Sequence, residues 1–383
     1  MKILFLDQSG KPGGAELCLL DVAQPYRDRC LVGLLADGSF RELLEQQGIP
    51  VQVLTGQAIQ VQKDSNLLKG LSSLGQLLPL IGQIAQLSRA YDVIYANTQK
   101  ALVVGAIASL LANRPLVYHL HDIVSSDHFS LINRRLIVGL ANRFASLVIA
   151  NSHASAASFF AAGGDRDRVK VVYNGFQLQR YQHHGETAAQ MRQTLGLGDR
   201  FVVGHFSRLS PWKGQQILID ALQHCPENVV ALLVGDALFG EDAFAKQLHQ
   251  QVEQLGLSDR VRFLGFRSDV PQLMTACNLV AHTSTAPEPF GRVIVESMLC
   301  GTPVVAAAAG GVMELIEPGK TGWLAPPGDS LKLAEIIQQC HSQPELAAAI
   351  ADNAQQTAIQ RFNLATTNQQ IARLLQQVVG DRG

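Results

Sequence analysis

Short uninterrupted runs of Val, Ile and Leu alternate with longer amphipathic stretches along all 383 residues of the chain. Continuous apolar runs are typical of strands buried on both faces, and the intervening stretches have the apolar spacing of helices. This alternation predicts parallel sheets with helices on both faces. In the first half of the chain, strands are expected at 3–6, 31–35, 51–54, 93–95, 116–119, 147–150 and 169–172.

A polar stretch at 177–184 separates these runs from a second series, which predicts strands at 202–205, 229–234, 261–264, 279–281 and 304–306. A chain of 383 residues is too long for one ordinary core, because domains average roughly 150 residues. We therefore predict an α/β protein with two Rossmann-like, doubly wound domains that face each other across a cleft. The expected domains are 1–178 and 179–362, with a joint near 177–186 and a C-terminal helix within 363–383.

Composition and charge narrow the possible functions. Apolar residues make up 47% of the chain and the net charge is −1, so a surface that binds nucleic acid is not expected. The six cysteines are scattered without a C-x-x-C pair, which is typical of reduced, buried thiols in a cytosolic protein. The sequence has no run of about 18 uncharged apolar residues, so no membrane span is expected. The expected location is cytoplasmic.

Neither expected domain carries the glycine fingerprint that follows the first strand of a dinucleotide-binding domain. Gly196-Leu197-Gly198 comes closest, but it precedes the strand at 202–205 and lacks the third glycine. A dinucleotide-dependent oxidoreductase is therefore disfavoured, and no cofactor is expected.

The most informative segment brings two glutamates, Glu288 and Glu296, to the end of a predicted strand. A short buried strand is expected to end at 282, and apolar spacing from Arg292 predicts a helix. Pro289 suits the start of that helix, where its missing N–H is not needed. Glu288 is then expected in an exposed loop at the carboxyl end of the strand, and Glu296 in the helix beyond.

This segment also predicts an anion site. The amides near Phe290, Gly291 and Arg292 are expected to point into the crevice, where a helix N-terminus favours an anion. Carboxylates accept hydrogen bonds from hydroxyls, and amides beside them would bind phosphate, so the combination indicates a sugar-nucleotide site. The alternative is that Glu288 caps the helix and Glu296 lies on its surface.

Two cations follow the first strand of the second domain. Arg208 and Lys213 flank Pro211 and precede Gly214, in a loop at the carboxyl end of the strand where α/β proteins bind ligands. Fixed cations at this place would stabilise the charge on a diphosphate leaving group without a metal ion. The alternative is that both are solvated surface charges.

The first domain carries matching signals at its strand ends. Gly13 and Gly14 follow the first strand, and Gly14 would allow the backbone to approach a phosphate. Glu16 begins the next helix, where its negative charge is favourable. His121 ends a predicted strand and is expected to contact a sugar or an acceptor, whereas His119 is expected to point the other way.

Taken together, these motifs resemble the retaining glycosyltransferases of family 4, which have the GT-B architecture. Six segments carry the likeness in the family's order: Gly13–Glu16, Val172–Gly175, Gly204–Gly214, Glu288–Glu296, Cys300–Val305 and Gly319–Gly322. The resemblance implies a sugar transferase with a nucleotide diphosphate sugar as donor and retention of anomeric configuration. It also implies that the first domain binds the acceptor, that the second binds the donor, and that the last helix packs on the first domain.

The resemblance implies catalytic roles for Glu288, Arg208, Lys213 and His121. It implies donor binding by Gly14, Phe290, Gly291, Arg292, Glu296 and Arg267. Glu288 would contact the transferred sugar, Glu296 the ribose, and Arg267 the surroundings of the base. No metal is expected, because the only Asp-x-Asp pair, Asp165 and Asp167, lies in a turn with too few oxygen ligands.

Several readings stay open at this point. The chain could be a catalytically silent nucleotide-sugar-binding or scaffold protein, a nucleotide-sugar epimerase or a phosphorylase of the same architecture. The acceptor could be a glycan, a lipid-linked sugar or a small molecule. The leucine-rich stretch 67–87 is favoured as core helix, and Arg134, Arg135 and Arg143 are the candidates for contact with a membrane or an anionic acceptor.

Overall fold

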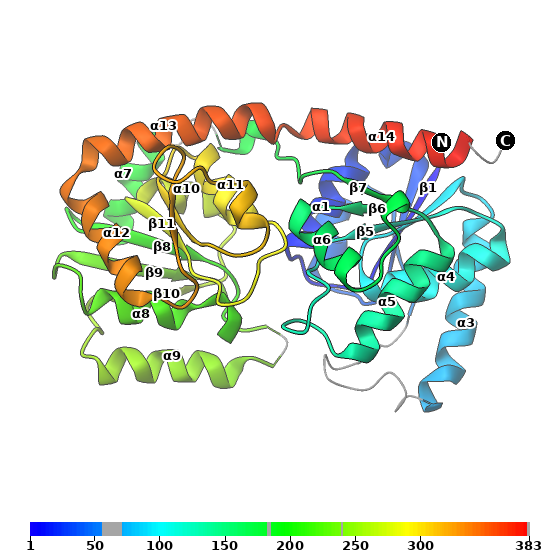
Figure 1. Cartoon of the computed structure of the whole chain (residues 1–383), viewed down its shortest axis with the longest axis horizontal. Coiled ribbons are helices and arrows are strands. Elements are labelled where there is room, and N and C mark those ends of the chain that lie inside the picture. The colour runs from blue at the N-terminus through cyan, green and yellow to red at the C-terminus, as the bar shows by residue number, and fades with distance from the viewer. Residues whose placement is uncertain (56–70, 182–184, 239, 381–383) are drawn as a thin grey trace. The chain divides into compact units, whose positions relative to one another are not determined.

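The computed structural model of the chain describes residues 1–55, 71–181, 185–238 and 240–380, without the side chains of 71–76 and 185–187. It divides into two compact units, each with its own parallel sheet (Figure 1). Unit 1 comprises Met1–Gly175 and Leu364–Gly383, and unit 2 comprises Phe176–Asn363. Residues 176–178 and 363 therefore fall in unit 2, not in the first domain as predicted. Part of the expected joint, 182–184, lies outside the described residues.

Unit 1 contains a seven-stranded parallel sheet in the order β3-β2-β1-β4-β5-β6-β7. The strands are β1 Ile3–Asp7, β2 Cys30–Leu34, β3 Val51–Val53, β4 Val93–Ala96, β5 Leu116–Leu120, β6 Ala145–Ala150 and β7 Val169–Val171. All seven predicted strands are confirmed. The chain order reverses between β1 and β4, and the carboxyl ends of strands at such a reversal are where α/β sheets commonly bind ligands.

Helices cover both faces of this sheet (Figure 1). They are α1 Gly14–Ala23, α2 Ser39–Gln46, α3 Leu71–Ser88, α4 Gln99–Ala112, α5 Leu131–Phe144, α6 His153–Ala161 and α14 Leu364–Gly380. On one face, Ile371 and Leu375 of α14 share a core with Leu19 of α1 and Phe5 of β1. The last helix is thus an integral part of unit 1, although more than 180 residues of unit 2 separate it from the rest of that unit.

The described part of the leucine-rich stretch is a core helix. In α3, which continues through Pro79, the side chains of Leu80, Ile81 and Ile84 are buried among those of unit 1, while residues 67–70 lie outside the description. Within the described residues, no helix combines the length and apolarity needed to cross a membrane. All six cysteines are free thiols as expected; five are buried and Cys300 is partly exposed.

Unit 2 contains a six-stranded parallel sheet in the order β10-β9-β8-β11-β12-β13. Its strands are β8 Phe201–Phe206, β9 Val229–Val234, β10 Val261–Gly265, β11 Leu279–His282, β12 Val304–Ala307 and β13 Trp323–Ala325. Its helices are α7 Gly185–Thr194, α8 Gln215–Leu222, α9 Asp242–Gln254, α10 Val270–Ala276, α11 Arg292–Leu299, α12 Ser330–Ser342 and α13 Pro344–Arg361. The five predicted strands are confirmed. The sixth, β13, was missed because three residues are too few for a recognisable apolar run.

Gly175 marks the place where the end of the first chain segment meets α14. A Cβ atom on Gly175 would lie 2.7 Å from Leu364 Cα and 2.8 Å from Thr367 Cβ. Thr367 also donates a hydrogen bond from Oγ1 to the Tyr173 carbonyl, at 3.3 Å. Since a side chain here would push backbone against backbone, glycine is required for α14 to dock on unit 1.

We expect Gly175→Ala to destabilise unit 1 by about 1–3 kcal/mol, the usual cost of an added methyl in a packed region. Urea denaturation followed by circular dichroism measures the unfolding of the chain. Tryptophan fluorescence follows the unfolding of unit 2 separately, because Trp212 and Trp323 both lie in that unit. Gly139→Ala in α5 is the matched control: a Cβ there meets nothing within 4 Å, so it should be neutral or stabilising by about 0.5–1 kcal/mol. An unchanged transition for Gly175→Ala would contradict the close approach.

Candidate active site

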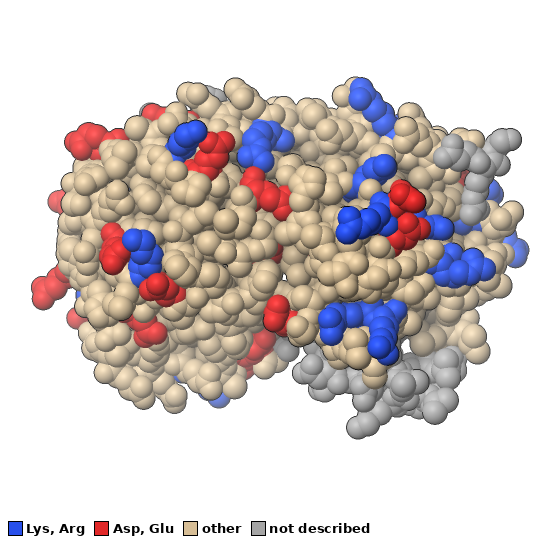
Figure 2. Space-filling model, viewed as in Figure 1, with Lys and Arg blue, Asp and Glu red and all other residues tan. Residues whose placement is uncertain are grey.

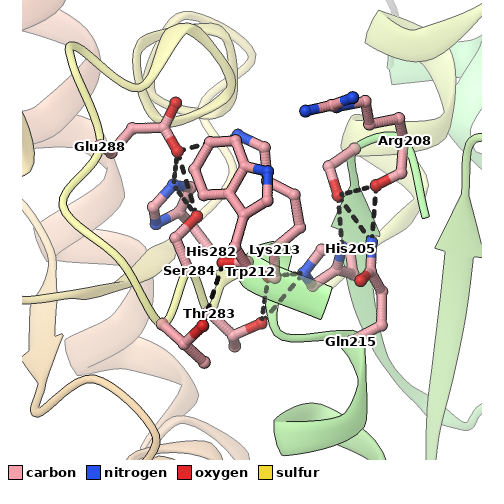
Figure 3. A network of polar contacts seen from close by, with 11 residues as sticks. His205, Arg208, Trp212, Lys213, Gln215, His282, Thr283, Ser284 and Glu288 are labelled. Atoms are coloured by element: carbon pink, nitrogen blue, oxygen red, sulfur yellow. Dashed lines mark hydrogen bonds and ion pairs between the residues drawn. The ribbon is translucent and has the colours of Figure 1, made fainter. Parts of the chain in front are cut away.

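Glu288 and Lys213 form an ion pair at the carboxyl ends of two adjacent strands (Figure 3). Lys213 ends a short 3₁₀ helix, Pro211–Lys213, that follows β8, and Glu288 lies in the loop that follows β11. The distance from Lys213 Nζ to Glu288 Oε2 is 2.8 Å, and the two side chains are only 16% and 12% exposed. The expectation that Glu288 is exposed is therefore wrong, since a neighbouring loop covers it and supplies its partner.

The contacts of the Glu288 carboxylate are concentrated on one oxygen. Besides the Lys213 ammonium, Ser284 Oγ donates to Glu288 Oε2 at 3.0 Å and His282 Nε2 donates to it at 3.2 Å. The other oxygen, Oε1, has no hydrogen bond within the described part of the chain, and Figure 3 shows it pointing away from the cluster. One oxygen thus fixes the side chain, and the second can accept hydrogen bonds from a ligand.

The environment keeps Glu288 ionised. Burial acts to raise the pKa of its carboxyl, but the Lys213 ammonium and the His282 hydrogen bond outweigh burial and hold that pKa well below its usual value. At neutral pH the group is therefore a carboxylate, which accepts hydrogen bonds and does not donate a proton.

The backbone around Lys213 is tied directly to the end of β11. Gly214 has a left-handed conformation (φ +76°), and a Cβ there would lie 1.9 Å from the Thr283 carbonyl oxygen. Thr283 Oγ1 donates to the Gly214 carbonyl at 2.7 Å, and His205 Nε2 contacts Thr283 Oγ1 at 3.0 Å. Burial lowers the pKa of His205 to about 3, so this histidine stays neutral. The loop with Lys213 is thereby fixed beside the loop with Glu288.

Trp212 brings the two predicted cations together. Lys213 Nζ lies 3.9 Å and Arg208 Cζ 5.9 Å from the centroid of a Trp212 ring, within the range of cation–π attraction. In Figure 3 the Arg208 guanidinium and the Glu288 carboxylate lie on opposite sides of this indole. Gln215 Nε2 holds the Arg208 backbone by donating to its carbonyl at 2.9 Å. The indole thus holds both cations near the Glu288 loop through contacts that do not neutralise their charge.

Glu296 lies on α11 and is mostly buried. Its Oε1 accepts a hydrogen bond from the Tyr181 hydroxyl at 3.5 Å and lies 3.6 Å from Arg292 Nε, one helical turn away. The Arg292 guanidinium also lies 4.6 Å from the Phe176 ring centroid. Arg292 is thus engaged by the start of unit 2 and by Glu296, and the two glutamates have different partners.

The start of α11 differs from the prediction. The helix begins at Arg292, and Gly291 precedes it in a left-handed conformation (φ +97°), so Pro289 lies in the loop and not at the helix start. The left-handed backbone at Gly291 lies between Pro289 and the first residue of the helix, so the proline is outside the helix. The Phe290 side chain is buried, stacked on Phe176 at 6.4 Å and edge-on to Phe362 at 5.9 Å. The Phe290 side chain is therefore part of the packed interior of unit 2.

Several residues of this site were not singled out from the sequence. Gly310 and Gly311 follow β12 and allow close approach to the Glu288 loop: a Cβ on Gly310 would lie 2.3 Å from the Glu288 carbonyl oxygen, to which Gly311 N donates at 2.8 Å. His282 and Ser284 hold the carboxylate directly. The sequence contained a signal for two of these features. His282 ends a predicted strand as His121 does, and the pair Gly310-Gly311 follows a strand as Gly13-Gly14 does.

Arg267 is placed apart from the Lys213–Glu288 pair. It follows β10, and its guanidinium forms a two-point contact with Asp269, with Nε–Oδ1 at 2.8 Å and Nη2–Oδ2 at 2.5 Å. This pairing raises the pKa of Arg267 and lowers that of Asp269, chiefly through the shared hydrogen bonds. Asp165, for its part, caps the 3₁₀ turn Arg166–Arg168, and its Oδ2 lies 2.9 Å from Arg168 Nε.

In unit 1, His121 is connected to a buried carboxyl group through Asn97. His121 Nε2 lies 2.9 Å from Asn97 Oδ1, and Asn97 Nδ2 donates to Asp7 Oδ2 at 2.6 Å. These residues lie at the carboxyl ends of β5, β4 and β1, which are neighbours in the sheet. The expectation that His119 points away from His121 is wrong: the two ring centroids are 3.9 Å apart, because residues two apart on a strand share a face.

Glu16 folds back onto the start of its own helix. Gly13 N donates to Glu16 Oε2 at 3.0 Å, and α1 begins at Gly14, two residues before the predicted start at Glu16. Burial, and then the nearby Asp7 carboxyl, raise the pKa of Glu16, and burial also raises that of Asp7. The expected negative charge on Glu16 is therefore incorrect near neutral pH, because two adjacent buried carboxyl groups retain a proton between them.

Comparison with known proteins links these features to one group of enzymes. The family model for the glycosyl transferase 4-like domain matches residues 13–175, and that for glycosyl transferases group 1 matches residues 187–357. Similar curated proteins include the D-inositol 3-phosphate glycosyltransferases of Streptomyces bingchenggensis (28% identical over 69% of this chain) and Mycobacterium sp. strain JLS (31% over 66%). The matched stretches span 62% and 60% of the length of those two proteins.

A solved structure is much more similar. The Anabaena protein Alr3699/HepE in complex with UDP-glucose is 62% identical, covers 98% of this chain and is itself covered completely, with a TM-score of 0.93. The same protein was also solved with UDP and glucose. Sucrose-phosphate synthase from Thermosynechococcus elongatus, 21% identical with a TM-score of 0.85 over 99% of this chain, shares the fold.

The Lys213–Glu288 pair should make unit 2 sensitive to acid. We expect Lys213→Met to lower the free energy of unfolding by about 3–5 kcal/mol at pH 7, since it leaves a buried carboxylate unpaired. Because the folded-state pKa of Glu288 lies below the ordinary 4.5, the pair stabilises fully above that pH and its contribution is lost as the pH falls through the folded-state pKa. In the folded variant the ammonium no longer opposes burial, so the pKa of Glu288 rises and its carboxyl takes up a proton as the pH falls from 7 towards 4. The difference between wild type and variant should therefore shrink over that range, because protonation removes the unpaired charge from the variant while the wild-type pair stays largely intact.

Urea denaturation followed by tryptophan fluorescence at the two pH values measures this difference. Lys320→Met is the control, because the Lys320–Glu317 pair is 75% and 64% exposed and should contribute at most about 1 kcal/mol. A difference for Lys213→Met that stays constant across this pH range would contradict the role given to the ion pair.

Proposed function

The chain belongs to the glycosyl transferases group 1 family, of GT-B architecture, and we propose that it transfers a hexosyl group from a UDP-linked sugar to an acceptor hydroxyl with retention of configuration. It is a glycosyltransferase by family. The choice of UDP-glucose as the first donor to test is supported by the 62% identical Anabaena protein, which was solved with that ligand. The observation that carries the proposal is the Glu288 carboxylate, fixed through Oε2 and open at Oε1 beside two cations.

The chemistry follows from the position of these charges. In the transfer, the bond between the anomeric carbon and the leaving phosphate oxygen breaks, and a bond to the acceptor oxygen forms on the same face of the sugar. Negative charge develops on the diphosphate, and Arg208 and Lys213 are held in place to stabilise it before the reaction begins. Glu288 Oε1 accepts hydrogen bonds from hydroxyls of the transferred sugar, which orients its anomeric carbon.

The acceptor proton needs a destination, and we assign it to the leaving phosphate oxygen. Glu288 is held ionised by Lys213 and His282, and its bound oxygen already accepts three hydrogen bonds, so a carboxylate with so low a pKa is a weak base. The departing oxygen lies on the face at which the acceptor arrives and gains basicity as its bond breaks. We further propose that Glu296 binds the ribose and that, in unit 1, His121 and the Gly14 amide bind hydroxyl and phosphate groups.

For the acceptor we propose a glycan or a lipid-linked sugar presented at a membrane surface. Helix α5 carries Arg134, Arg135 and Arg143 and has no acidic residue, and its first two residues, Leu131 and Ile132, are 52% and 47% exposed. Figure 2 shows basic side chains gathered over this part of unit 1. Arginines beside exposed apolar side chains suit contact with anionic headgroups. On this basis we place the protein on the cytoplasmic face of a membrane.

Product analysis tests the proposal directly. The full chain is incubated with UDP-glucose and with a mixture of oligosaccharide and lipid-linked acceptors, and products are resolved by mass spectrometry and NMR. We expect UDP release coupled to an α-linked product. An isomerised donor would indicate an epimerase, and a sugar phosphate formed only with inorganic phosphate would indicate a phosphorylase. Tight donor binding with no turnover would support a catalytically silent binding protein, and each of these three outcomes overturns the proposal.

Arg208 tests whether fixed cations supply the stabilisation of the leaving group. We expect Arg208→Ala to lower kcat by about 100-fold, as removal of one fixed electrostatic contact does in other enzymes. Lys320→Ala, at an exposed pair of the same unit, should leave kcat unchanged. Because no divalent cation is assigned to the diphosphate, EDTA should leave wild-type transfer intact. Activity lost in EDTA and restored by Mg²⁺ or Mn²⁺ would reject the metal-independent mechanism.

Substitution of Glu296 tests the proposal that its carboxylate binds the ribose of the donor. We expect Glu296→Ala to weaken UDP binding by about 1.5–3 kcal/mol, or roughly 10- to 150-fold, the usual value of hydrogen bonds to a charged group. Wild type should prefer UDP to 2′-deoxy-UDP, and the variant should not, by isothermal titration calorimetry. Glu288→Gln is the matched control, because it should slow transfer while leaving UDP affinity near wild type. A variant that still discriminates against the deoxy ligand would remove Glu296 from the ribose.

A further inference from the structure

Three side chains of unit 1 place potential metal ligands together. Cys18 of α1, His119 of β5 and His121 just beyond it each offer one donor atom, and these atoms all lie within 4.8 Å of one another. Cys18 and His119 are buried, whereas His121 is partly exposed at the carboxyl end of the sheet. Thiol and imidazole are the donors that zinc and related transition metals prefer.

The orientation of His121 can be derived from its partner. Asn97 Nδ2 donates to Asp7 Oδ2 at 2.6 Å and to the Ala15 carbonyl at 3.1 Å, so both of its hydrogens face acceptors. Asn97 Oδ1 is then the atom that faces His121, and His121 Nε2 must carry the proton that it donates across 2.9 Å. In this tautomer the other ring nitrogen, Nδ1, carries a lone pair and is the donor atom that His121 would use toward a metal ion.

His119 and Cys18 are likewise each in contact with one polar partner from unit 1. His119 Nδ1 lies 2.7 Å from the Tyr95 hydroxyl, and its Nε2 is buried without a hydrogen-bond partner in the described part of the chain. A buried polar atom left in this state costs about 1–3 kcal/mol unless something binds it. Cys18 Sγ lies 3.3 Å from Asn174 Oδ1. Hydrogen-bond partners that orient each ligand from behind are the usual arrangement around protein-bound metals.

We propose that Cys18, His119 and His121 form a site for a thiophilic transition-metal ion such as Zn²⁺. Binding exchanges the Cys18 thiol proton for the metal, so a thiolate and two neutral imidazoles hold the ion and the fourth tetrahedral position faces solvent. Metal–donor distances of about 2.0–2.3 Å require donors roughly 3.3–3.8 Å apart, so the side chains must close by about 1 Å. The partial exposure of His121 leaves room for that adjustment.

The consequence for activity rests on the proposed function. His121 is one of the residues assigned to hydroxyl binding, and a metal on its Nδ1 removes the lone pair that a substrate hydroxyl would use. The ion therefore acts as an inhibitor, which agrees with transfer that does not need a divalent cation. Submicromolar Zn²⁺ would slow transfer, and chelation would restore it.

Cobalt titration of the full-length protein tests the site without any assay of transfer. We expect one Co²⁺ per chain, with near-ultraviolet thiolate-to-cobalt absorption and the intense visible bands of tetrahedral cobalt, both abolished by excess Zn²⁺. Cys18→Ser should remove the thiolate band, and His121→Gln, at a partly exposed position, should weaken binding at least about 10-fold. Cys30→Ser is the control, because Cys30 is an equally buried thiol of unit 1 that lies outside the cluster.

The outcomes separate the two proposals. No thiolate band, or a band that survives in Cys18→Ser or disappears equally in Cys30→Ser, overturns the metal site whatever the enzyme does. In the transfer assay, Cys18→Ser should keep its activity and lose inhibition by Zn²⁺. If the cobalt spectrum is as expected but no sugar is transferred under any condition, the metal site stands and the proposed function fails.

Discussion

The ion pair between Lys213 and Glu288 is the interaction on which the site in unit 2 depends. It joins the loops that follow β8 and β11, two strands that are adjacent in the sheet but lie far apart in the chain. Because both side chains are largely buried, neither charge is stable without the other. The pair also decides the chemical character of Glu288, since the ammonium overcomes burial and keeps the carboxyl group ionised, with one oxygen bound and one open to a ligand.

Close backbone approach allows this pair to form. Gly214 brings one loop against the Thr283 carbonyl, and Gly310 brings another against the Glu288 carbonyl, at distances that exclude any side chain. Trp212 then contacts both cations, with its ring centroids 3.9 Å from Lys213 Nζ and 5.9 Å from Arg208 Cζ. A site for a charged donor needs rigid charges that water does not screen, and backbone contacts of this kind give rigidity without adding polar groups that would require partners.

Unit 1 uses the same edge of its sheet in a different way. Asp7, Asn97 and His121 lie at the carboxyl ends of three neighbouring strands and form a connected series of hydrogen bonds in place of an ion pair. Asp7 and Glu16 are buried close together and have raised pKa values, so this carboxyl pair retains a proton near neutral pH. In unit 2, by contrast, Lys213 and Glu288 are both charged. The strand ends of unit 1 thus present a hydrogen-bonded series of side chains, and those of unit 2 present fixed charges.

The sequence by itself determined the two parallel sheets and placed most of the polar side chains at strand ends, because apolar run length and periodicity are local properties. It missed β13, which has too few residues to show a pattern, and it placed Pro289 at a helix start that Gly291 in fact provides. Only the tertiary structure decided that Glu288 is buried, that His282 and Ser284 hold it, and that His119 and His121 stack beside Cys18. The burial of a side chain and the identity of its partners depend on which distant segments of the chain lie in contact. Those contacts are decided by the order of the strands across the sheet, which is not a local property of the sequence.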